Sequence, residues 1–383
     1  MAGLVLTALL CFWLHGTTYV RYQAASYWSF LLVYGVHLSA GLITTAANKT
    51  KYVQDVVLQL PFLLLPIAFW LLPPIPTPLL RGLWLWFIGL TALAAMWSTG
   101  NYLLHQDAIN SLYLHSKVMP TEPDHIRFSL MITLAIAVGT LLVAHGAVAS
   151  MLRWLVIGAS AGLALFQHLL AVRSGLLTLY VVGGVGVLWL VLRLRDYRRG
   201  MQLLAVLLAL PLVSYLCFPT FRNKFTNTRE DVERVEHTAS ANNYSLVGRV
   251  YSYRVAFKVF QDAPVLGVGK AAMEPAMAEY YQRDFPNINP DSYILPHNQF
   301  LYTAVAFGAM GLLLFIIGFY YAGISTWPRY APLLLVHYLI VTLSFLVEYT
   351  IETQIGIAFS LFFLLLALEG NKPVEAAEFW RPR

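Results

Sequence analysis

The sequence predicts an all-α polytopic membrane protein. Of its 383 residues, 58% are hydrophobic and only 11% are charged, whereas an ordinary soluble domain carries about 25% charged residues. A soluble chain this apolar could not cover its own surface with polar groups. The apolar residues gather into runs close to the ~20 residues that cross a bilayer as a helix. One long polar stretch, between Phe218 and Asn298, interrupts these runs.

Eleven apolar runs are clear candidates for membrane spans. The run nearest the amino terminus, Leu4–Tyr19, has no basic start and no clear cleavage site, so we expect a retained helix rather than a signal peptide. A twelfth candidate, Asn101–Val118, is marginal because its histidines and Asp107 are costly in lipid. The eleven runs are Leu4–Tyr19, Tyr27–Ala46, Val53–Leu72, Leu79–Trp97, Phe128–His145, Leu152–Val172, Leu176–Leu194, Leu203–Phe218, Phe300–Tyr321, Ala331–Val347 and Ile355–Leu368.

Positive charge on the loops predicts the orientation of these spans. The strongest basic cluster lies at residues 193–199 and should face the cytoplasm. The next run then carries the polar stretch 219–297 to the external side. The preceding run places Arg173 on that same external side. Arg153, Arg329 and the basic tail then fall inside, in agreement with the rule.

The number of membrane crossings between loops of assigned side favours the twelfth span, because each span carries the chain to the opposite side. If Lys49 and Lys51 are also cytoplasmic, one span must lie within 97–128. The prediction is therefore about twelve spans, eleven clear and one marginal, with both termini inside. The predicted segments are an N-terminal transmembrane bundle at 1–218, an external loop at 219–297, C-terminal transmembrane helices at 298–369 and a cytoplasmic tail at 370–383.

A helix that lies on the membrane surface is expected within the loop, at residues 245–262. Val250, Tyr253, Phe257 and Phe260 recur at helical spacing and form one apolar stripe. A proline two residues beyond the helix ends it. Such a helix typically lies in the interface, with its polar groups at headgroup depth.

Three arginines and one histidine are candidate site residues. Arg249 and Arg254 flank the apolar stripe, where each could bind substrate or simply reach lipid phosphates. Arg173 stands at a tight turn between two runs, where it could also anchor a helix. Guanidinium groups that share one external cavity would suit a phosphate or a diphosphate. His297 follows Pro296 at the start of a run, where it could act as a general base or merely cap the helix.

Other polar residues receive simpler interpretations. Glu348 and Glu352, between the last two spans, are expected to be solvated loop carboxylates rather than partners of the arginines. Packing or helix-to-helix hydrogen bonds are assigned to four histidines in or beside apolar runs, His37, His145, His168 and His337.

The sequence predicts no cofactor, no metal and no nucleic-acid partner. No Asp-x-Asp pair lies on an external loop, no His/Cys cluster has zinc spacing, and no nucleotide P-loop occurs. The net charge of +6 is too small and too dispersed for nucleic acid. The energy for a reaction would then have to come with the substrate itself.

The polar stretch and its flanks resemble the O-antigen ligase family, which comprises polytopic bacterial inner-membrane glycosyltransferases. The resemblance covers about residues 170–325, while the N-terminal half is similar only in its hydrophobic character. The motifs that carry it are, in order, Arg173-Ser174-Gly175, Gly248-Arg249-Val250-Tyr251-Ser252-Tyr253-Arg254-Val255-Ala256, Asp262-Ala263-Pro264-Val265-Leu266-Gly267-Val268-Gly269, His297-Asn298-Gln299-Phe300-Leu301 and Gly308-Ala309-Met310-Gly311-Leu312.

The resemblance implies a fold like that of the GT-C glycosyltransferases. It also implies transfer of O-antigen from undecaprenyl diphosphate to a lipid A-core sugar, on the periplasmic side of a Gram-negative inner membrane. Arg173 and Arg249 would bind the diphosphate, and His297 would be the essential histidine. Arg254 is our addition, as a further diphosphate ligand. An acceptor hydroxyl would attack the anomeric carbon while His297 takes its proton, in one inverting displacement without a metal.

Two other classes of function remain as alternatives. Within the same family, an O-antigen polymerase often has two substantial external loops, and a protein O-oligosaccharyltransferase usually has a larger soluble extension. This sequence shows one loop and a short tail. A lipid or solute transporter commonly has paired broken helices and inverted repeats, and the sequence shows neither. These observations favour the ligase.

Overall fold

The computed structural model describes residues 2–15, 24–42, 44–114, 117–326 and 332–370. Within these ranges every regular element is helical, which confirms the predicted all-α class. Seven helices of the described ranges are long and apolar enough to cross a membrane, and three shorter apolar helices accompany them. The protein is therefore a polytopic membrane protein. The total of twelve spans and the GT-C likeness stay predictions, and Arg329 and the tail beyond Gly370 lie outside the described residues.

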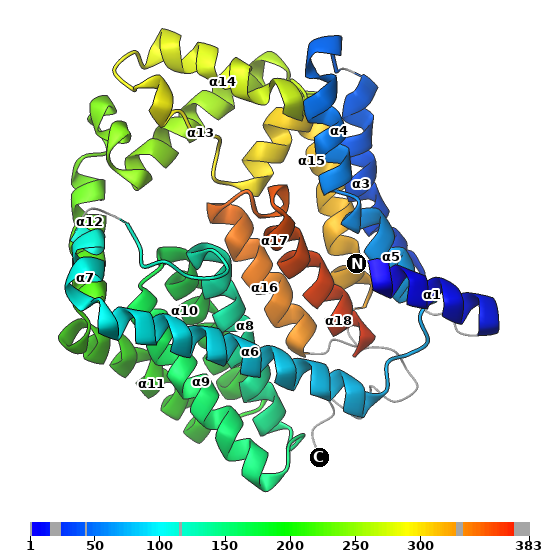
Figure 1. Ribbon diagram of the computed structural model, residues 1–383, viewed down its shortest axis with the longest axis vertical. Coiled ribbons are helices and arrows are strands. Elements are labelled where there is room, and N and C mark those ends of the chain that lie inside the picture. The colour runs from blue at the N-terminus through cyan, green and yellow to red at the C-terminus, as the bar shows by residue number, and fades with distance from the viewer. Residues whose placement is uncertain (1, 16–23, 43, 115–116, 327–331, 371–383) are drawn as a thin grey trace. The chain divides into compact units, whose positions relative to one another are not determined.

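The chain divides into two compact units whose segments alternate along the sequence. Among the described residues, the first unit takes those up to 76, 231–326, 332–334 and 345–370. Figure 1 colours the chain by residue number, so these segments can be followed there. The second unit takes residues 77–230 and 335–344, so α16 (Pro332–Val347) contributes to both. The division into sequential membrane segments concerns topology and stays a prediction.

The first unit combines membrane helices with most of the polar loop. Its α-helices are α1 (Ala2–His15), α2 (Ala24–Trp28), α3 (Phe30–Ser39), α4 (Lys49–Leu58), α5 (Pro61–Leu71), α13 (Ser245–Asp262), α14 (Lys270–Asp284), α15 (Gln299–Ser325), α17 (Gln354–Ile357) and α18 (Phe363–Glu369). Short 3-10 helices are η2 (Ala40–Leu42), η3 (Ala46–Asn48), η5 (Thr238–Asn242), η6 (Pro290–Ser292) and η7 (Thr350–Glu352), and η8 (Ala358–Phe362) is a π-helical turn.

The second unit is a bundle of helices, most of which are long and apolar enough to cross a membrane. They are α6 (Thr77–Leu104), α7 (Gln106–Leu114), α8 (His125–Ala144), α9 (Ser150–Leu170), α10 (Arg173–Leu188) with the π-helical turn η4 (Trp189–Arg193), α11 (Tyr197–Cys217) and α12 (Pro219–Glu233). The polar loop is thus divided, because α12 belongs largely to this unit and the rest of the loop to the other. In α12, Thr220 donates a hydrogen bond to the carbonyl oxygen of Leu169 at the end of α9 (2.7 Å).

The membrane helix α15 is interrupted at Gly308, although the sequence shows no sign of a broken helix. Gly308 has a φ of 68°, and a Cβ there would collide with the backbone of Val265. The two carbonyl groups before the break accept hydrogen bonds from the amides of Val268 (3.0 Å) and Gly269 (2.9 Å). The two amides after it donate to the carbonyls of Pro264 (2.8 Å) and Val265 (3.3 Å). The loop thereby satisfies the backbone groups that the break leaves without helical partners, as a membrane interior requires.

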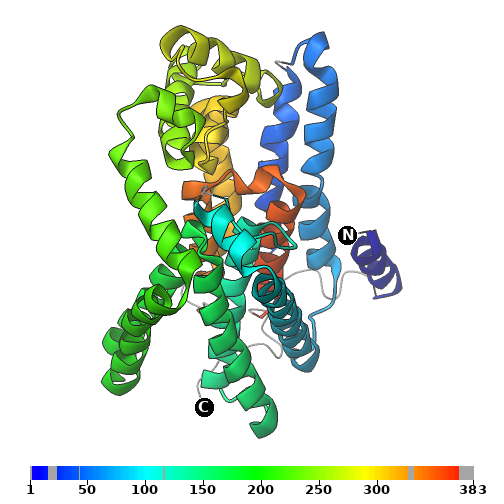
Figure 2. The same ribbon diagram turned by 60° about the vertical axis from the view of Figure 1, so that its left-hand side comes forward.

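This exchange of backbone bonds explains two of the glycine-containing motifs. The proline-glycine segment after α13 and the Gly308 segment of α15 form one structural element. It attaches the loop helices α13 and α14 to the first part of α15, which is the part that begins beside His297. Figure 2 shows the yellow-green loop helices beside the gold first part of α15.

The helix α13 has the expected bounds but packs through a different face. Its buried apolar row is Val247, Tyr251, Val255 and Val259, which contacts side chains of α14 and α15. The stripe expected from the sequence lies beside that row, and its Phe257 is 54% exposed. The helix carries two apolar rows, and the row of three valines and one tyrosine is the one that packs closely.

Contacts of α4 remove the premise for a twelfth span. Lys51 forms an ion pair with Glu274 of α14 (2.8 Å), and Asp55 pairs with Lys270, the first residue of α14. The start of α4 therefore lies on the same side as the loop, so the expectation that the loop is external while Lys49 and Lys51 are cytoplasmic is wrong. Within 97–128, α7 has nine residues, which rise only about 14 Å along a helix. The described residues there form no further span.

Candidate active site

Glu348 joins the two strongest candidate residues of the loop. Its Oε1 accepts a hydrogen bond from Nη2 of Arg249 (2.7 Å), and its Oε2 lies 3.0 Å from Nδ1 of His297. The Glu348 side chain is 3% exposed, whereas those of Arg249 and His297 are 28% and 20% exposed. We call these three residues the Glu348 cluster. A buried carboxylate thus connects a cation and an imidazole that both keep an open edge.

Local structure fixes the position of His297. Asn298 caps α15 by accepting a hydrogen bond from the amide of Leu301 (2.9 Å), and it donates to the carbonyl of Leu346 (3.2 Å). Tyr253, one helical turn beyond Arg249 on α13, donates to the carbonyl oxygen of His297 (2.6 Å). The imidazole also lies beside the Tyr349 ring, with 5.0 Å between ring centroids. Elements on both sides therefore hold the histidine at the start of α15.

The contact with Glu348 determines what the imidazole can do. A carboxylate accepts hydrogen bonds, so it favours the tautomer in which Nδ1 carries the proton. The Nε2 atom is then unprotonated and can accept a proton from a substrate. Glu348 would also stabilise the positive charge that the ring gains. This arrangement is suited to general base catalysis.

Arg249 keeps hydrogen-bonding capacity for an anion. Its guanidinium has five N–H donors, and contacts with Glu348 and with the carbonyl of Val347 (Nη1, 3.3 Å) account for two of them. Its remaining donors can meet phosphate oxygens in the bidentate geometry that guanidinium favours. The same residue can thus orient Glu348 and bind an anionic substrate.

Tyr253 remains a hydrogen-bond donor throughout the physiological pH range. Burial raises the pKa of its phenol, the charge of Arg249 lowers this pKa and that of Glu348 raises it, with a net increase. The protonated hydroxyl can therefore hold the carbonyl of His297 at any pH at which a cell lives.

Arg254 does not join the Glu348 cluster in this structure. Five residues separate it from Arg249, which corresponds to about 140° around the helix. Its guanidinium carbon lies 5.1 Å from the centroid of the Tyr251 ring. The role of Arg254 in diphosphate binding stays a prediction.

Arg173 belongs to the second unit and starts α10, with only Ala171 and Val172 between it and the end of α9. Its Nε donates a hydrogen bond to Thr228 of α12 (2.8 Å). A Cβ at Gly175 would collide with Gln167 and Ser129, so this glycine lets α10 approach α8 and α9 closely. The Arg-Ser-Gly motif is therefore a tight helix junction, as expected. That Arg173 lies close to Arg249 and His297 stays a prediction.

A second group of charges lies beside the Glu348 cluster. The ammonium of Lys270 contacts the carboxylates of both Asp55 and Glu352, and Asp55 also lies 3.0 Å from Nδ1 of His37. Gln299 donates to Glu352 (2.9 Å) and accepts from the amide of Ile351 (3.1 Å). We call His37, Asp55, Lys270, Glu352 and Gln299 the Lys270 network. It holds the turn 347–352, whose first part carries Glu348.

The Lys270 network is closed to solvent and internally balanced. Its ion-pairing side chains are at most 16% exposed. Burial lowers the pKa of Lys270, but Glu352 and Asp55 raise it by more, so the net pKa is raised and the ammonium stays charged. His37, Asp55 and Glu352 also offer possible metal-ligand atoms within 4.8 Å of one another. The ammonium already compensates the two carboxylates, which accounts for the grouping.

Comparison with known families now decides the classification. A family model described as O-antigen ligase matches residues 158–316. The chain carries an O-antigen ligase domain. This confirms the family that the motifs resemble. The matched segment includes Arg173, Arg249, His297 and the break at Gly308, and it ends before Glu348. No curated protein matches the chain in sequence.

Sequence reasoning missed the partners of the ligase domain's charged residues. The expectation that Glu348 and Glu352 are solvated loop carboxylates is wrong, because their side chains are 3% and 4% exposed. No sequence pattern singles out Asp55 or Lys270. A usable signal exists, since Glu348 directly follows an apolar run and a buried carboxylate needs a cationic partner. The interpretation of His37 as a helix-to-helix hydrogen bond is confirmed, because it joins α3 to α4.

Proposed function

We propose that this protein is an O-antigen ligase, which transfers O-antigen polysaccharide from undecaprenyl diphosphate to a lipid A-core sugar. The observation that carries the proposal is the Glu348 cluster. A general base and an anion-binding guanidinium share one buried carboxylate, inside and beside a segment that matches the O-antigen ligase family.

The proposed reaction is a single displacement at the anomeric carbon of the donor sugar. The acceptor hydroxyl oxygen forms the new glycosidic bond, and its proton passes to Nε2 of His297. The bond between the anomeric carbon and the diphosphate oxygen breaks, so undecaprenyl diphosphate leaves with the electron pair. Attack from the opposite face inverts the configuration. Glu348 balances the imidazolium, and the proton later returns to solvent.

Arginines are proposed to stabilise the leaving diphosphate. Arg249 offers its remaining N–H donors, and Arg173 provides a second guanidinium, with Arg254 as a further ligand. Charge that develops on a leaving group is stabilised best by donors that are already in place. In this proposal the guanidinium groups take the part that a divalent cation plays in other glycosyl transfers.

We further propose that the loop 219–297 faces the periplasm of a Gram-negative inner membrane, with the carboxyl-terminal end of the last span in the cytoplasm. The basic residues 193–199 support the orientation by the positive-inside rule. The second, partly exposed apolar row of α13 suits the membrane surface on which both lipid-linked substrates would lie.

Transfer by the purified protein tests the proposal. The chain in proteoliposomes is given undecaprenyl diphosphate-linked glycan and lipid A-core, without nucleotide and with a chelator, and the ligated product is measured. We expect His297→Gln and Arg249→Gln to lose at least about 10²-fold in rate while remaining folded. The matched controls are His105→Gln and Arg283→Gln, which change exposed residues of α6–α7 and α14 and should stay within about twofold.

The product distinguishes the proposed ligase from its relatives. A longer glycan that is still attached to undecaprenyl diphosphate would identify a polymerase, and glycan on an acceptor peptide would identify a protein oligosaccharyltransferase. Near-normal transfer by His297→Gln would remove this residue from the mechanism. No transfer to any of these acceptors would overturn the proposal.

A further inference from the structure

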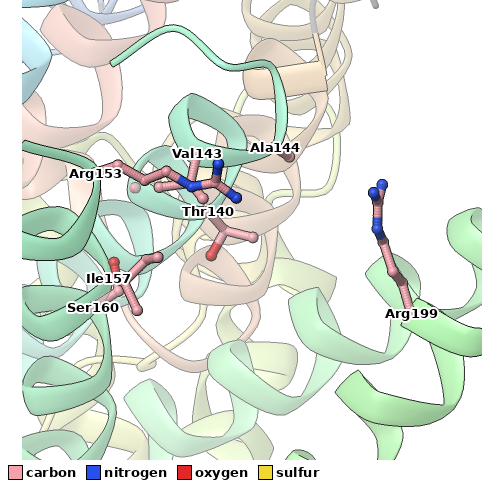
Figure 3. A pocket seen from close by; sticks show the side chains of 8 residues that line it. Thr140, Val143, Ala144, Arg153, Ile157, Ser160 and Arg199 are labelled. Carbon is pink, nitrogen blue, oxygen red and sulfur yellow. The ribbon is translucent and has the colours of Figure 1, made fainter. Parts of the chain in front are cut away.

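A cavity of about 350 Å³ lies in the second unit. It is bounded by the end of α8, the start of α9 and the start of α11 (Figure 3). All three helices are long and apolar enough to cross a membrane. The cavity therefore opens between membrane spans, at the end where α9 and α11 begin. Its lining residues are Gly139, Thr140, Val143, Ala144, Arg153, Ile157, Ser160 and Arg199.

The cavity has two arginines at its mouth and a mixed polar and apolar lining inside. Arg153 and Arg199 come from different helices, and Figure 3 shows the Arg153 side chain reaching across toward Thr140. Val143, Ala144 and Ile157 supply apolar wall. From Arg153 to Ser160, α9 rises about 10 Å, or two turns. This depth and polarity fit a phosphate at the mouth and part of an acyl chain inside.

The positive charge at the mouth is incompletely compensated within the protein. Arg199 pairs with Asp196 (3.4 Å) with a side chain that is 73% exposed, so the pairing is weak. For Arg153 the described residues provide no side-chain ion pair, and none of the lining residues is acidic. The amino-terminal end of α9, which has no side-chain cap, adds partial positive charge at the same place, whereas the Asp196 carboxylate caps that of α11. Deeper in the cavity, the hydroxyl of Ser160 is buried without a hydrogen-bond partner among the described residues.

We propose that this cavity binds the phosphate headgroup of an anionic phospholipid, with Arg153 as the main contact. A zwitterionic headgroup would bring an ammonium to a rim that has two guanidinium groups and no lining carboxylate. Basic pockets between membrane helices on the cytoplasmic side are suited to anionic lipids. The loop charges place Arg153 and residues 193–199 on that side. The site is independent of the transfer reaction proposed above.

Lipid binding to the purified full-length protein tests this proposal. Phosphatidylglycerol and phosphatidylcholine with identical acyl chains are titrated separately, together with inorganic phosphate. Bound lipid is counted by native mass spectrometry, and the unfolding temperature is followed by tryptophan fluorescence. We expect phosphatidylglycerol to bind and to raise the unfolding temperature, whereas phosphatidylcholine and phosphate at equal concentration do so much less.

Two variants and a matched control locate the site. Arg153→Gln removes a charged hydrogen-bond donor and should weaken phosphatidylglycerol binding by about tenfold or more. Ala144→Trp fills the wall and should weaken it as well. Arg198→Gln removes the same charge from a neighbouring exposed position that does not line the cavity, and it should change binding by less than about twofold.

Three results would overturn the proposal. Equal losses in Arg153→Gln and Arg198→Gln would indicate general surface attraction. Equal binding of phosphatidylcholine would indicate an ordinary lipid contact. Equal stabilisation by inorganic phosphate that survives Ala144→Trp would indicate a free-anion site. If Ala144→Trp does not fold, the pair of exposed arginine variants still decides.

Discussion

The Glu348 cluster and the Lys270 network are two neighbouring groups of charges that share the turn 347–352. In the cluster, Arg249 and His297 are 28% and 20% exposed around a buried carboxylate. In the network, the ammonium and both of its carboxylates are at most 16% exposed. The cluster keeps donors and an imidazole nitrogen for an outside molecule. The network satisfies its charges internally.

This difference suggests a division of roles. Buried charges that are fully paired hold structural elements in place and do not react with substrate, since separating them leaves an uncompensated charge. The Lys270 network joins α4, α14, α15 and η7, and the same turn positions Glu348. We therefore expect network variants to change stability and cluster variants to change the reaction. The predictions below test this separation, beginning with the largest effect.

Replacing Lys270 should destabilise the fold strongly. Lys270→Met leaves two buried carboxylates without their cation, which typically costs about 3–5 kcal/mol of unfolding free energy. Thermal unfolding in detergent measures the loss. The matched control is Lys258→Met, whose ion pair with Asp284 involves a lysine that is 42% exposed and should contribute less than about 1 kcal/mol. Equal losses in the two variants would contradict a structural role for the network.

Neutralising the whole network should restore much of this stability. The variant Lys270→Met/Asp55→Asn/Glu352→Gln removes the unpaired charges together, and neutral replacements of buried ion groups are often tolerated.

The contribution of Lys270 to stability depends on pH with a definite sign. Because the folded pKa of Lys270 is raised above 10.5, its stabilising contribution is complete below that value and declines as pH rises through the folded pKa. The difference between wild type and Lys270→Met should therefore stay constant from about pH 7 to 9.

Replacing Glu348 should affect the reaction far more than the fold. Both of its partners are donors, and the amide of Glu348→Gln has one acceptor oxygen and turns an N–H toward one of them. Loss of the balancing charge should lower kcat by about 10²–10³. The transfer assay measures this, with Glu274→Gln as the control, because Glu274 belongs to an exposed pair with Lys51. A Glu348→Gln variant that keeps most of its rate would contradict the cluster's proposed role.

The same contrast explains what the sequence could and could not predict. Apolar runs predicted the class and nearly all of the described membrane helices, and helical spacing predicted α13 with its bounds, because both signals are local. The break at Gly308 and the pairing of Asp55 with Lys270 depend on segments far apart in the chain. A charge taken alone shows no preference between solvent and a distant partner. The sequence therefore predicts a solvated Glu348, whereas the structure buries this carboxylate between Arg249 and His297.

Arg249 provides a sharper test, because lysine preserves its charge. Arg249→Lys loses the planar fork that binds two oxygens, so kcat/KM for the donor should fall by about 10–10²-fold with little change in unfolding temperature. Arg254 lies on the same helix, and its guanidinium contacts the Tyr251 ring instead of the Glu348 cluster. Arg254→Gln should therefore change kcat/KM by less than about threefold. A larger effect of Arg254→Gln would support its predicted part in diphosphate binding and would require the helix to present a second face.

Tyr253 should give the smallest effect, since it acts on His297 through a single hydrogen bond to the backbone. Tyr253→Phe keeps the ring and removes about 1 kcal/mol of interaction, which corresponds to about a fivefold decrease in kcat. Tyr251→Phe is the matched control, because its hydroxyl bonds the carbonyl of Val235 on the packed face of the same helix (3.2 Å). If Tyr251→Phe lowers kcat as much, the effect comes from loosening α13. A decrease confined to Tyr253→Phe would show that the reaction depends on where α13 holds the histidine.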